Sequence, residues 1–112
     1  MSQKEINKEV QEKIQELQIL EQGLQNIAMQ KRAFQIEFNE AETALKEVDK
    51  TKDDVFKIVG QIMLKSKKQD VKKELEEKKK LLELRLKSIE DQEKQISSDL
   101  EKTRQEIIGN IK

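Results

Sequence analysis

Residues 55–65 read Val-Phe-Lys-Ile-Val-Gly-Gln-Ile-Met-Leu-Lys, and this stretch decides how the rest of the chain is arranged. Short apolar, partly β-branched runs flank Gly60-Gln61, and glycine at the first central position of a two-residue turn is typical of a type II′ β-hairpin. The turn predicts a register in which Val59 faces Ile62 and Phe56 faces Lys65. Alternation along the strands then puts large apolar side chains on both faces of the hairpin: Val55, Val59, Ile62 and Leu64 on one, and Phe56, Ile58 and Met63 on the other.

Neither face of this hairpin suits water. An isolated two-stranded hairpin is marginally stable, and its two unpaired edges invite pairing with other strands. We therefore predict that hairpins from several chains assemble into an oligomeric β-barrel platform through Val55, Phe56, Ile58, Val59, Gly60, Ile62, Met63 and Leu64. The alternative is a loop that packs on the helices of its own chain.

The segments on both sides of the hairpin repeat apolar residues at alternating spacings of three and four, which is typical of the a/d seam of a coiled coil. In the first segment 11 of 13 such positions are apolar. They form the series Ile6, Val10, Lys13, Leu17, Leu20, Leu24, Ile27, Lys31, Phe34, Phe38, Ala41, Leu45 and Val48, which only Lys13 and Lys31 interrupt.

The second segment has a weaker seam, with seven apolar residues at ten positions. Its members are Leu75, Lys79, Leu82, Leu86, Ile89, Glu93, Ile96, Leu100, Thr103 and Ile107. Ser66 and Gln69 have the spacing of a capping box at its start. The pattern predicts a mainly α fold, with helices over about 2–51 and 67–109 joined by a hairpin over about 55–65. We expect residues 1–112 to form a single domain that folds back as a long antiparallel coiled-coil helical hairpin. The alternative is a parallel homodimer through either seam, but the similar helix lengths and the short link favour the hairpin.

Composition excludes several classes of function. Of 112 residues 34% are hydrophobic and 41% charged, so a thick globular core is not expected. Proline is absent, which permits long helices. Histidine and cysteine are absent too, which removes the commonest general base and two common metal ligands. We therefore expect that the protein is not an enzyme and that it binds neither a metal nor a cofactor.

Charge and hydropathy also limit the partners. The 23 basic residues balance the 23 acidic ones, so no net field draws the chain to nucleic acid or to a membrane surface. Lysines gather between Lys65 and Lys80, but Glu74, Glu76 and Glu77 interleave with them, which favours a solvated face over a nucleic-acid site. No apolar run is long enough to cross a bilayer, and we expect a soluble, cytoplasmic protein.

Three stretches together resemble the beta class of prefoldin subunits in its archaeal form. They are Phe-Asn-Glu-Ala-Glu-Thr-Ala-Leu-Lys-Glu-Val over 38–48, the hairpin from Phe56 through Gly60 to Lys65, and Leu-Glu-Leu-Arg-Leu-Lys-Ser-Ile-Glu-Asp-Gln-Glu over 82–93. Phe56 stands where the archaeal family more often has Tyr, which keeps the ring. A single hairpin resembles the beta class, since alpha-class subunits carry two.

The resemblance implies an ATP-independent chaperone. It implies a hexamer of two alpha and four beta subunits, in which hairpins form a double β-barrel and coiled coils hold non-native polypeptides at their tips for a group II chaperonin. The residues expected to bind clients lie near both chain ends: Ile6, Val10, Ile14, Ile107, Ile108 and Ile111. In the alternative reading these residues only complete the coiled coil, and the protein is a structural spacer or tether without client binding.

Overall fold

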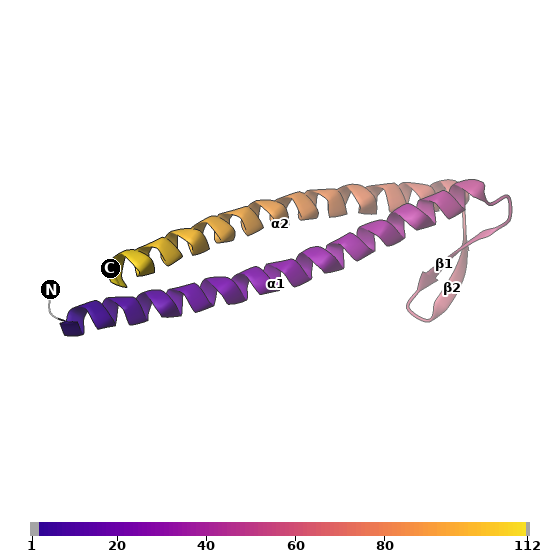
Figure 1. The fold of residues 1–112 in the computed structure, drawn as a ribbon. Helices are drawn as coiled ribbons and strands as arrows, with labels where there is room; N and C mark the ends of the chain where they lie inside the picture. The colour runs from indigo at the N-terminus through magenta and orange to yellow at the C-terminus, as the bar shows by residue number, and fades with distance from the viewer. Residues whose placement is uncertain (1–2, 112) are drawn as a thin grey trace. The chain divides into compact units, whose positions relative to one another are not determined.

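The computed structural model describes the backbone of residues 3–111 and the side chains of residues 7–110. Helix α1 (Gln3–Lys50) leads into strand β1 (Val55–Val59), strand β2 (Ile62–Ser66) and helix α2 (Lys68–Ile111), as Figure 1 shows. The predicted fold class is confirmed: two long helices are joined in the sequence by one short antiparallel hairpin. Assembly into a barrel stays a prediction.

Contacts divide the chain into two compact units. The first, which we call the terminal helix pair, comprises Met1–Lys31 and Ser88–Lys112. The second, the hairpin unit, comprises Arg32–Lys87 and includes both strands.

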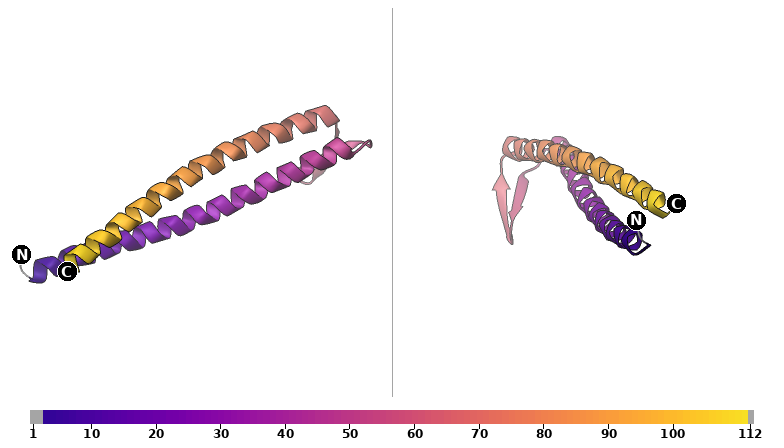
Figure 2. Two further views of the ribbon diagram at one scale, coloured as in Figure 1. Left: turned by 45° about the horizontal axis from the view of Figure 1, so that its top comes forward. Right: turned by 90° about the vertical axis from the view of Figure 1, so that its left-hand side faces the viewer.

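The terminal helix pair is antiparallel, because contacts move backwards along α2 as they move forwards along α1. Lys13 meets Glu106, Glu21 meets Arg104, and Lys31 meets Glu93. A Cβ added at Gly23 would lie 3.8 Å from Ile96 Cδ1, which places a close approach of the helices between these ion pairs. The two segments lie side by side in both views of Figure 2.

The same reversal holds within the hairpin unit. There Arg85 lies over the ring of Phe34, with 5.7 Å from the guanidinium carbon to the ring centroid, and Lys79 Nζ lies 5.4 Å from the centroid of Phe38. Further along α1, Lys72 Nζ lies 3.0 Å from Asp49 Oδ1. Cations over aromatic faces attract the ring's negative face, so these contacts hold polar α2 residues against the apolar seam.

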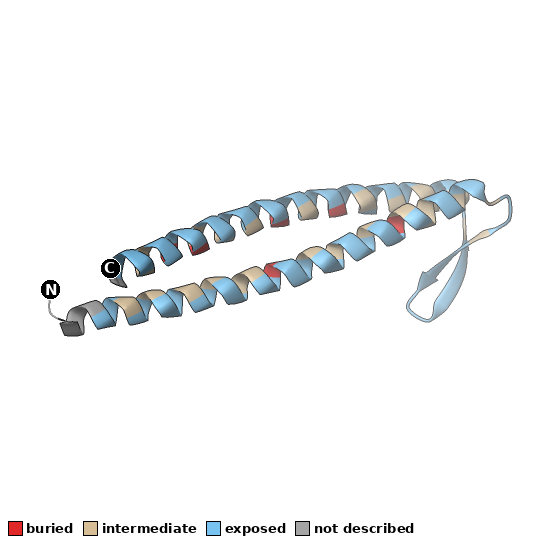
Figure 3. Cartoon of the chain, viewed as in Figure 1, coloured by how far each residue is buried: buried red, intermediate tan, exposed pale blue. Residues whose placement is uncertain are grey.

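Both seams are confirmed by burial. Every predicted seam residue whose side chain is described, from Val10 to Val48 and from Leu75 to Ile107, is buried or half-buried. The most covered positions lie on the facing sides of the helices in each unit (Figure 3). They are Ile27, Ala41, Leu82, Ile89, Leu100 and the polar Thr103.

The junction between α1 and α2 is held by a lysine instead of the predicted capping box. Lys68 Nζ donates hydrogen bonds to the backbone oxygens of Asp49, at 3.3 Å, and Thr51, at 3.1 Å. Asp49 lies in the last turn of α1, where backbone oxygens have no partner within the helix, and Thr51 directly follows the helix. A cation at this position suits the negative end of the helix dipole. The capping-box prediction was wrong because Ser66 belongs to β2, where its hydroxyl donates to the Leu64 carbonyl oxygen at 3.5 Å.

Candidate assembly and client-binding sites

The hairpin has the predicted register. Val59 pairs with Ile62, Ile58 with Met63, Lys57 with Leu64 and Phe56 with Lys65, and Val55 adds a further pair with Ser66. Gly60 has φ of +61°, and no other residue of the described chain has positive φ. A type I′ turn would need positive φ at Gln61 as well, so the observed backbone fits the type II′ turn.

The hairpin's apolar side chains are uncovered on both faces. Six of them are between 50% and 69% exposed, although each is large and apolar: Phe56, Ile58, Val59, Ile62, Met63 and Leu64. Val55, at the base of β1, is half-buried. The sheet has only these two strands within the described chain, so each strand keeps one unpaired edge. The alternative of a loop packed on its own helices does not fit this exposure.

Two ion pairs fix the hairpin to its surroundings in the hairpin unit. Lys57 Nζ lies 2.7 Å from Glu74 Oε2 on α2, and Lys65 Nζ lies 3.3 Å from Asp54 Oδ2 in the turn before β1. Both pairs are solvent-exposed and therefore contribute little stability. Each strand's lysine thus lies against an acid outside the two strands, while the apolar side chains next to both lysines are exposed.

Three of the eight lysines between Lys65 and Lys80 have acidic partners, and one of these is the Lys65–Asp54 pair described above. Lys72 pairs with Asp49, and Lys79 Nζ lies 3.9 Å from Glu42 Oε2. The Asp49 carboxylate, which accepts a hydrogen bond from Lys72, raises the pKa of that ammonium. These contacts, together with the interleaved glutamates, favour the interpretation of this segment as a solvated face whose charge is partly neutralised within the chain.

Two of the six predicted client-binding residues are exposed apolar side chains. Ile14 on α1 is 40% exposed and Ile108 on α2 is 45% exposed, and both belong to the terminal helix pair. Val10 and Ile107 are half-buried seam residues. The side chains of Ile6 and Ile111 lie outside the described residues.

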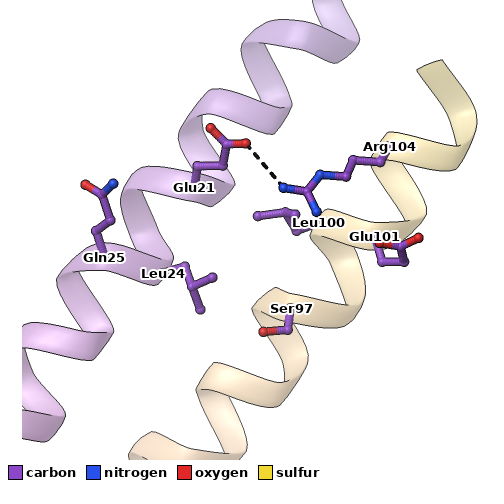
Figure 4. A pocket seen from close by; sticks show the side chains of 7 residues that line it. All are labelled: Glu21, Leu24, Gln25, Ser97, Leu100, Glu101 and Arg104. Carbon is purple, nitrogen blue, oxygen red and sulfur yellow. Dashed lines mark ion pairs between the residues drawn. The ribbon is translucent and has the colours of Figure 1, made fainter. Parts of the chain in front are cut away.

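An open groove lies between the helices of the terminal pair, and sequence reasoning missed it (Figure 4). Leu24 and Leu100 point into it, and its volume is about 370 Å³. The Glu21 carboxylate and the Arg104 guanidinium reach across at 3.7 Å. Small Ser97 on the rim of the groove is the only sequence signal, since a short side chain beside the seam leaves room above the leucines.

A second groove of about 430 Å³ lies nearer the chain ends, lined by Glu9, Glu12, Lys13, Glu106 and Asn110. The Lys13 ammonium contacts Glu106 and lies 3.5 Å from Glu16 Oε2. Hydrogen bonding to Lys13 lowers the pKa of the Glu106 carboxyl, and the same contact raises the pKa of Lys13. In the sequence Lys13 only interrupts the apolar seam. In the structure its ammonium group forms ion pairs with Glu16 and Glu106 at this groove.

The described residues show neither a helix apolar enough over sufficient length to span a bilayer nor a cluster of three potential metal-binding side chains. Away from the seam and outside the predicted sites, large apolar side chains are exposed singly on both helices. These are Ile19, Met29 and Ile36 on α1 and Leu81 and Leu84 on α2.

Comparison with known proteins decides the family. A family model described as "Prefoldin subunit" matches residues 11–112. The chain belongs to the prefoldin subunit family. The resemblance to beta-class prefoldin is confirmed by relatives named prefoldin subunit beta: one from Methanothrix thermoacetophila is 43% identical over 96 residues, covering 84% of this chain and 80% of the relative. Another from Archaeoglobus fulgidus is 37% identical over 105 residues, covering 92% of this chain and 90% of the relative.

The prefoldin fold is matched in three dimensions as well. The crystal structure of the prefoldin beta subunit from Thermococcus strain KS-1 superposes with a TM-score of 0.82 at 35% identity, covering 88% of this chain and 89% of that chain. The prefoldin assignment therefore extends over nearly all of the helices and the hairpin described above.

Proposed function

We propose that this chain, acting as one prefoldin-like domain, is a subunit of an ATP-independent chaperone in the cytoplasm. It binds non-native polypeptides at the terminal helix pair, prevents their aggregation and passes them to a group II chaperonin. No catalysis and no cofactor enter this function. Membership of the prefoldin family supports it, and the observation that carries the client-binding step is the exposure of Ile14 and Ile108, one from each helix of the terminal pair.

Isoleucines in this setting suit a holdase. A side chain that is about half exposed retains apolar surface, and burying it against a client yields about 25 cal/mol per Å². Several such weak contacts bind many sequences without selecting one, since apolar burial is non-directional. The seam beneath keeps the two helices paired while these side chains stay available.

The hairpin supplies assembly in this proposal. Exposed apolar residues on both faces and two free strand edges are the features that a β-barrel shared among chains would bury and pair. We propose that the hairpins of four such chains and of two alpha-class partners form this platform, as the family resemblance implies. Replacement of Val59 and Ile62 by Lys places two charges opposite each other on one face, and native mass measurement should then show loss of the hexamer.

Client binding is tested by protection of a denatured protein from aggregation. The hexamer carrying Ile14→Ser and Ile108→Ser should lose most of its protection. The matched control carries Ile19→Ser and Met29→Ser, since these residues are also exposed and apolar in the terminal pair but lie outside the predicted client site.

Native mass must show that both variants remain hexameric. Full protection by the Ile14/Ile108 variant would contradict this client site. Absence of protection by the unmodified hexamer would instead favour the spacer function.

A further inference from the structure

The charge of this chain is segregated between its two units, although the total is zero. The terminal helix pair contains eight Lys and Arg residues and eleven Asp and Glu residues, for a net charge of −3. The hairpin unit contains fifteen basic and twelve acidic residues, for a net charge of +3. The unit that carries the exposed Ile14 and Ile108 is therefore the acidic one.

The apolar groove of this unit has an acidic rim. Leu24 and Leu100 form its apolar part, and Glu21, Glu101 and Arg104 are its charged lining residues. Glu21 already neutralises Arg104, as Figure 4 shows, and Glu101 accepts a hydrogen bond from the Gln105 amide at 3.1 Å. An apolar side chain placed on the two leucines would thus lie beside the Glu101 carboxylate, which has no ion pair among the described residues.

The second groove adds to this negative charge. Lys13, the one cation among its described lining residues, is shared by Glu16 and Glu106. Glu9 and Glu12 line the same groove, are exposed, and form no ion pair within the described part of the chain.

We propose that the terminal helix pair prefers client segments in which apolar residues are flanked by lysine or arginine. This inference rests on the proposed client-binding function and names the class of polypeptide bound. Apolar side chains would occupy the groove over Leu24 and Leu100 and contact Ile14 and Ile108, and flanking cations would approach the carboxylates of Glu9, Glu12 and Glu101.

Charge complementarity selects this occupant over others. Nucleic acid would bring phosphates to a surface of net negative charge, and a second terminal helix pair would bring another −3. Complementary potentials favour encounter and suppress wrong partners through like-charge repulsion. A segment with flanking Asp or Glu would make the same apolar contacts against that repulsion.

The test uses two fluorescent peptides with identical apolar residues, one flanked by lysines and one by glutamates. Binding to the assembled full-length protein is measured by anisotropy. At low salt the lysine peptide should bind tighter on the order of tenfold. The difference should shrink towards zero near 1 M salt, where the screening length falls to about 3 Å.

A matched pair of variants locates the effect. Glu9→Gln with Glu12→Gln should remove much of the preference for the lysine peptide. Glu37 and Glu40, exposed in the hairpin unit, occupy the same positions of the seven-residue repeat later in α1. Glu37→Gln with Glu40→Gln changes charge equally and should leave the preference intact.

Each outcome decides the inference. Equal affinity for the two peptides, or an equal loss of preference in both variants, would overturn the charge preference and leave the proposed chaperone function standing. Failure of both peptides to bind at any salt concentration would overturn the preference and the client-binding function together.

Discussion

The ammonium nitrogen of Lys31 lies 3.3 Å from Oε1 of Glu93, so the lysine that interrupts the first seam faces the glutamate that interrupts the second. A slip of one seven-residue repeat would place Lys31 against Leu100 or Leu86 instead. That slip would leave both charges unpaired against apolar neighbours, which costs more than an imperfect apolar contact. The two interruptions together therefore specify one register of the antiparallel helices.

Replacing both members of this pair tests that role. Because desolvating two charges offsets their attraction, Lys31→Leu combined with Glu93→Leu should stabilise the fold, by about 1 to 3 kcal/mol. Calorimetry should show a higher Tm, while Glu93→Gln alone should lower it slightly. A lower Tm in the double variant would show that the pair contributes net stability and not only register.

The contact of Lys13 with Glu106 predicts a pH dependence. The folded-state pKa of Glu106 lies below its ordinary value of 4.5, so its contribution is complete above that pH and is lost as pH falls through the lowered value. Glu106→Gln should lower Tm at pH 7, and the difference from the unmodified protein should shrink as the pH falls below 4.5 and through the lowered folded-state pKa. Glu9→Gln, in the same groove but without an ion pair in the described chain, should show little difference at either pH. A Tm difference that stays constant as the pH is lowered, down to the most acidic pH at which the protein is still folded, would point to packing instead of charge.

Replacing either of two glycines by alanine should change the stability of the protein, in opposite directions. A Cβ at Gly60 or at Gly109 would meet nothing within 4 Å, so steric contact does not separate them. Gly60 has positive φ, and Gly60→Ala should destabilise the hairpin by about 1 to 2 kcal/mol. Gly109 is helical, and Gly109→Ala should stabilise α2 by up to about 1 kcal/mol. Hydrogen exchange of the strand and α2 amides distinguishes the two, and equal protection of the strand amides in Gly60→Ala would contradict the turn assignment.

Two leucines close together on α2 allow a buried seam position to be compared with a surface position. Leu82 is 2% exposed and Leu84 is 67% exposed. Leu82→Ala should lower the free energy of unfolding by about 2 to 5 kcal/mol through the cavity it leaves, whereas Leu84→Ala should change it by less than about 0.5 kcal/mol. Chemical denaturation measures both, and similar losses would mean that Leu84 is buried in an assembled interface.

The seams and the hairpin register could be predicted because each follows from a local rule. A seven-residue period assigns facing positions, and a two-residue turn containing Gly60 leaves one pairing for the strands. The partners of the interrupting lysines could not be predicted, because the acid opposite Lys13 or Lys31 depends on the mutual register of two helices. The capping-box prediction at Ser66 failed for a similar reason. The three-residue spacing from Ser66 to Gln69 is the same whether Ser66 ends a strand or precedes a helix.

The candidate site was only partly accessible to sequence reasoning. Positions beside the seam account for the exposure of Ile14 and Ile108, whereas Val10 and Ile107 are half-buried because the helices stay paired there. Client binding by any of these residues stays a prediction. The groove over Leu24 and Leu100 depends on the short side chain of Ser97 and the distance between helices. No one-dimensional pattern reports that distance.

The uncovered hairpin makes a freshly synthesised copy of this chain resemble the molecules it is proposed to serve. Until other chains cover Ile58, Met63 and their neighbours, the subunit displays apolar surface and open strand edges, the features by which cells recognise misfolded protein. We expect a cell that makes this chain in excess of its partners to burden its own quality control. Balanced subunit synthesis is thus a requirement that the hairpin places on the cell.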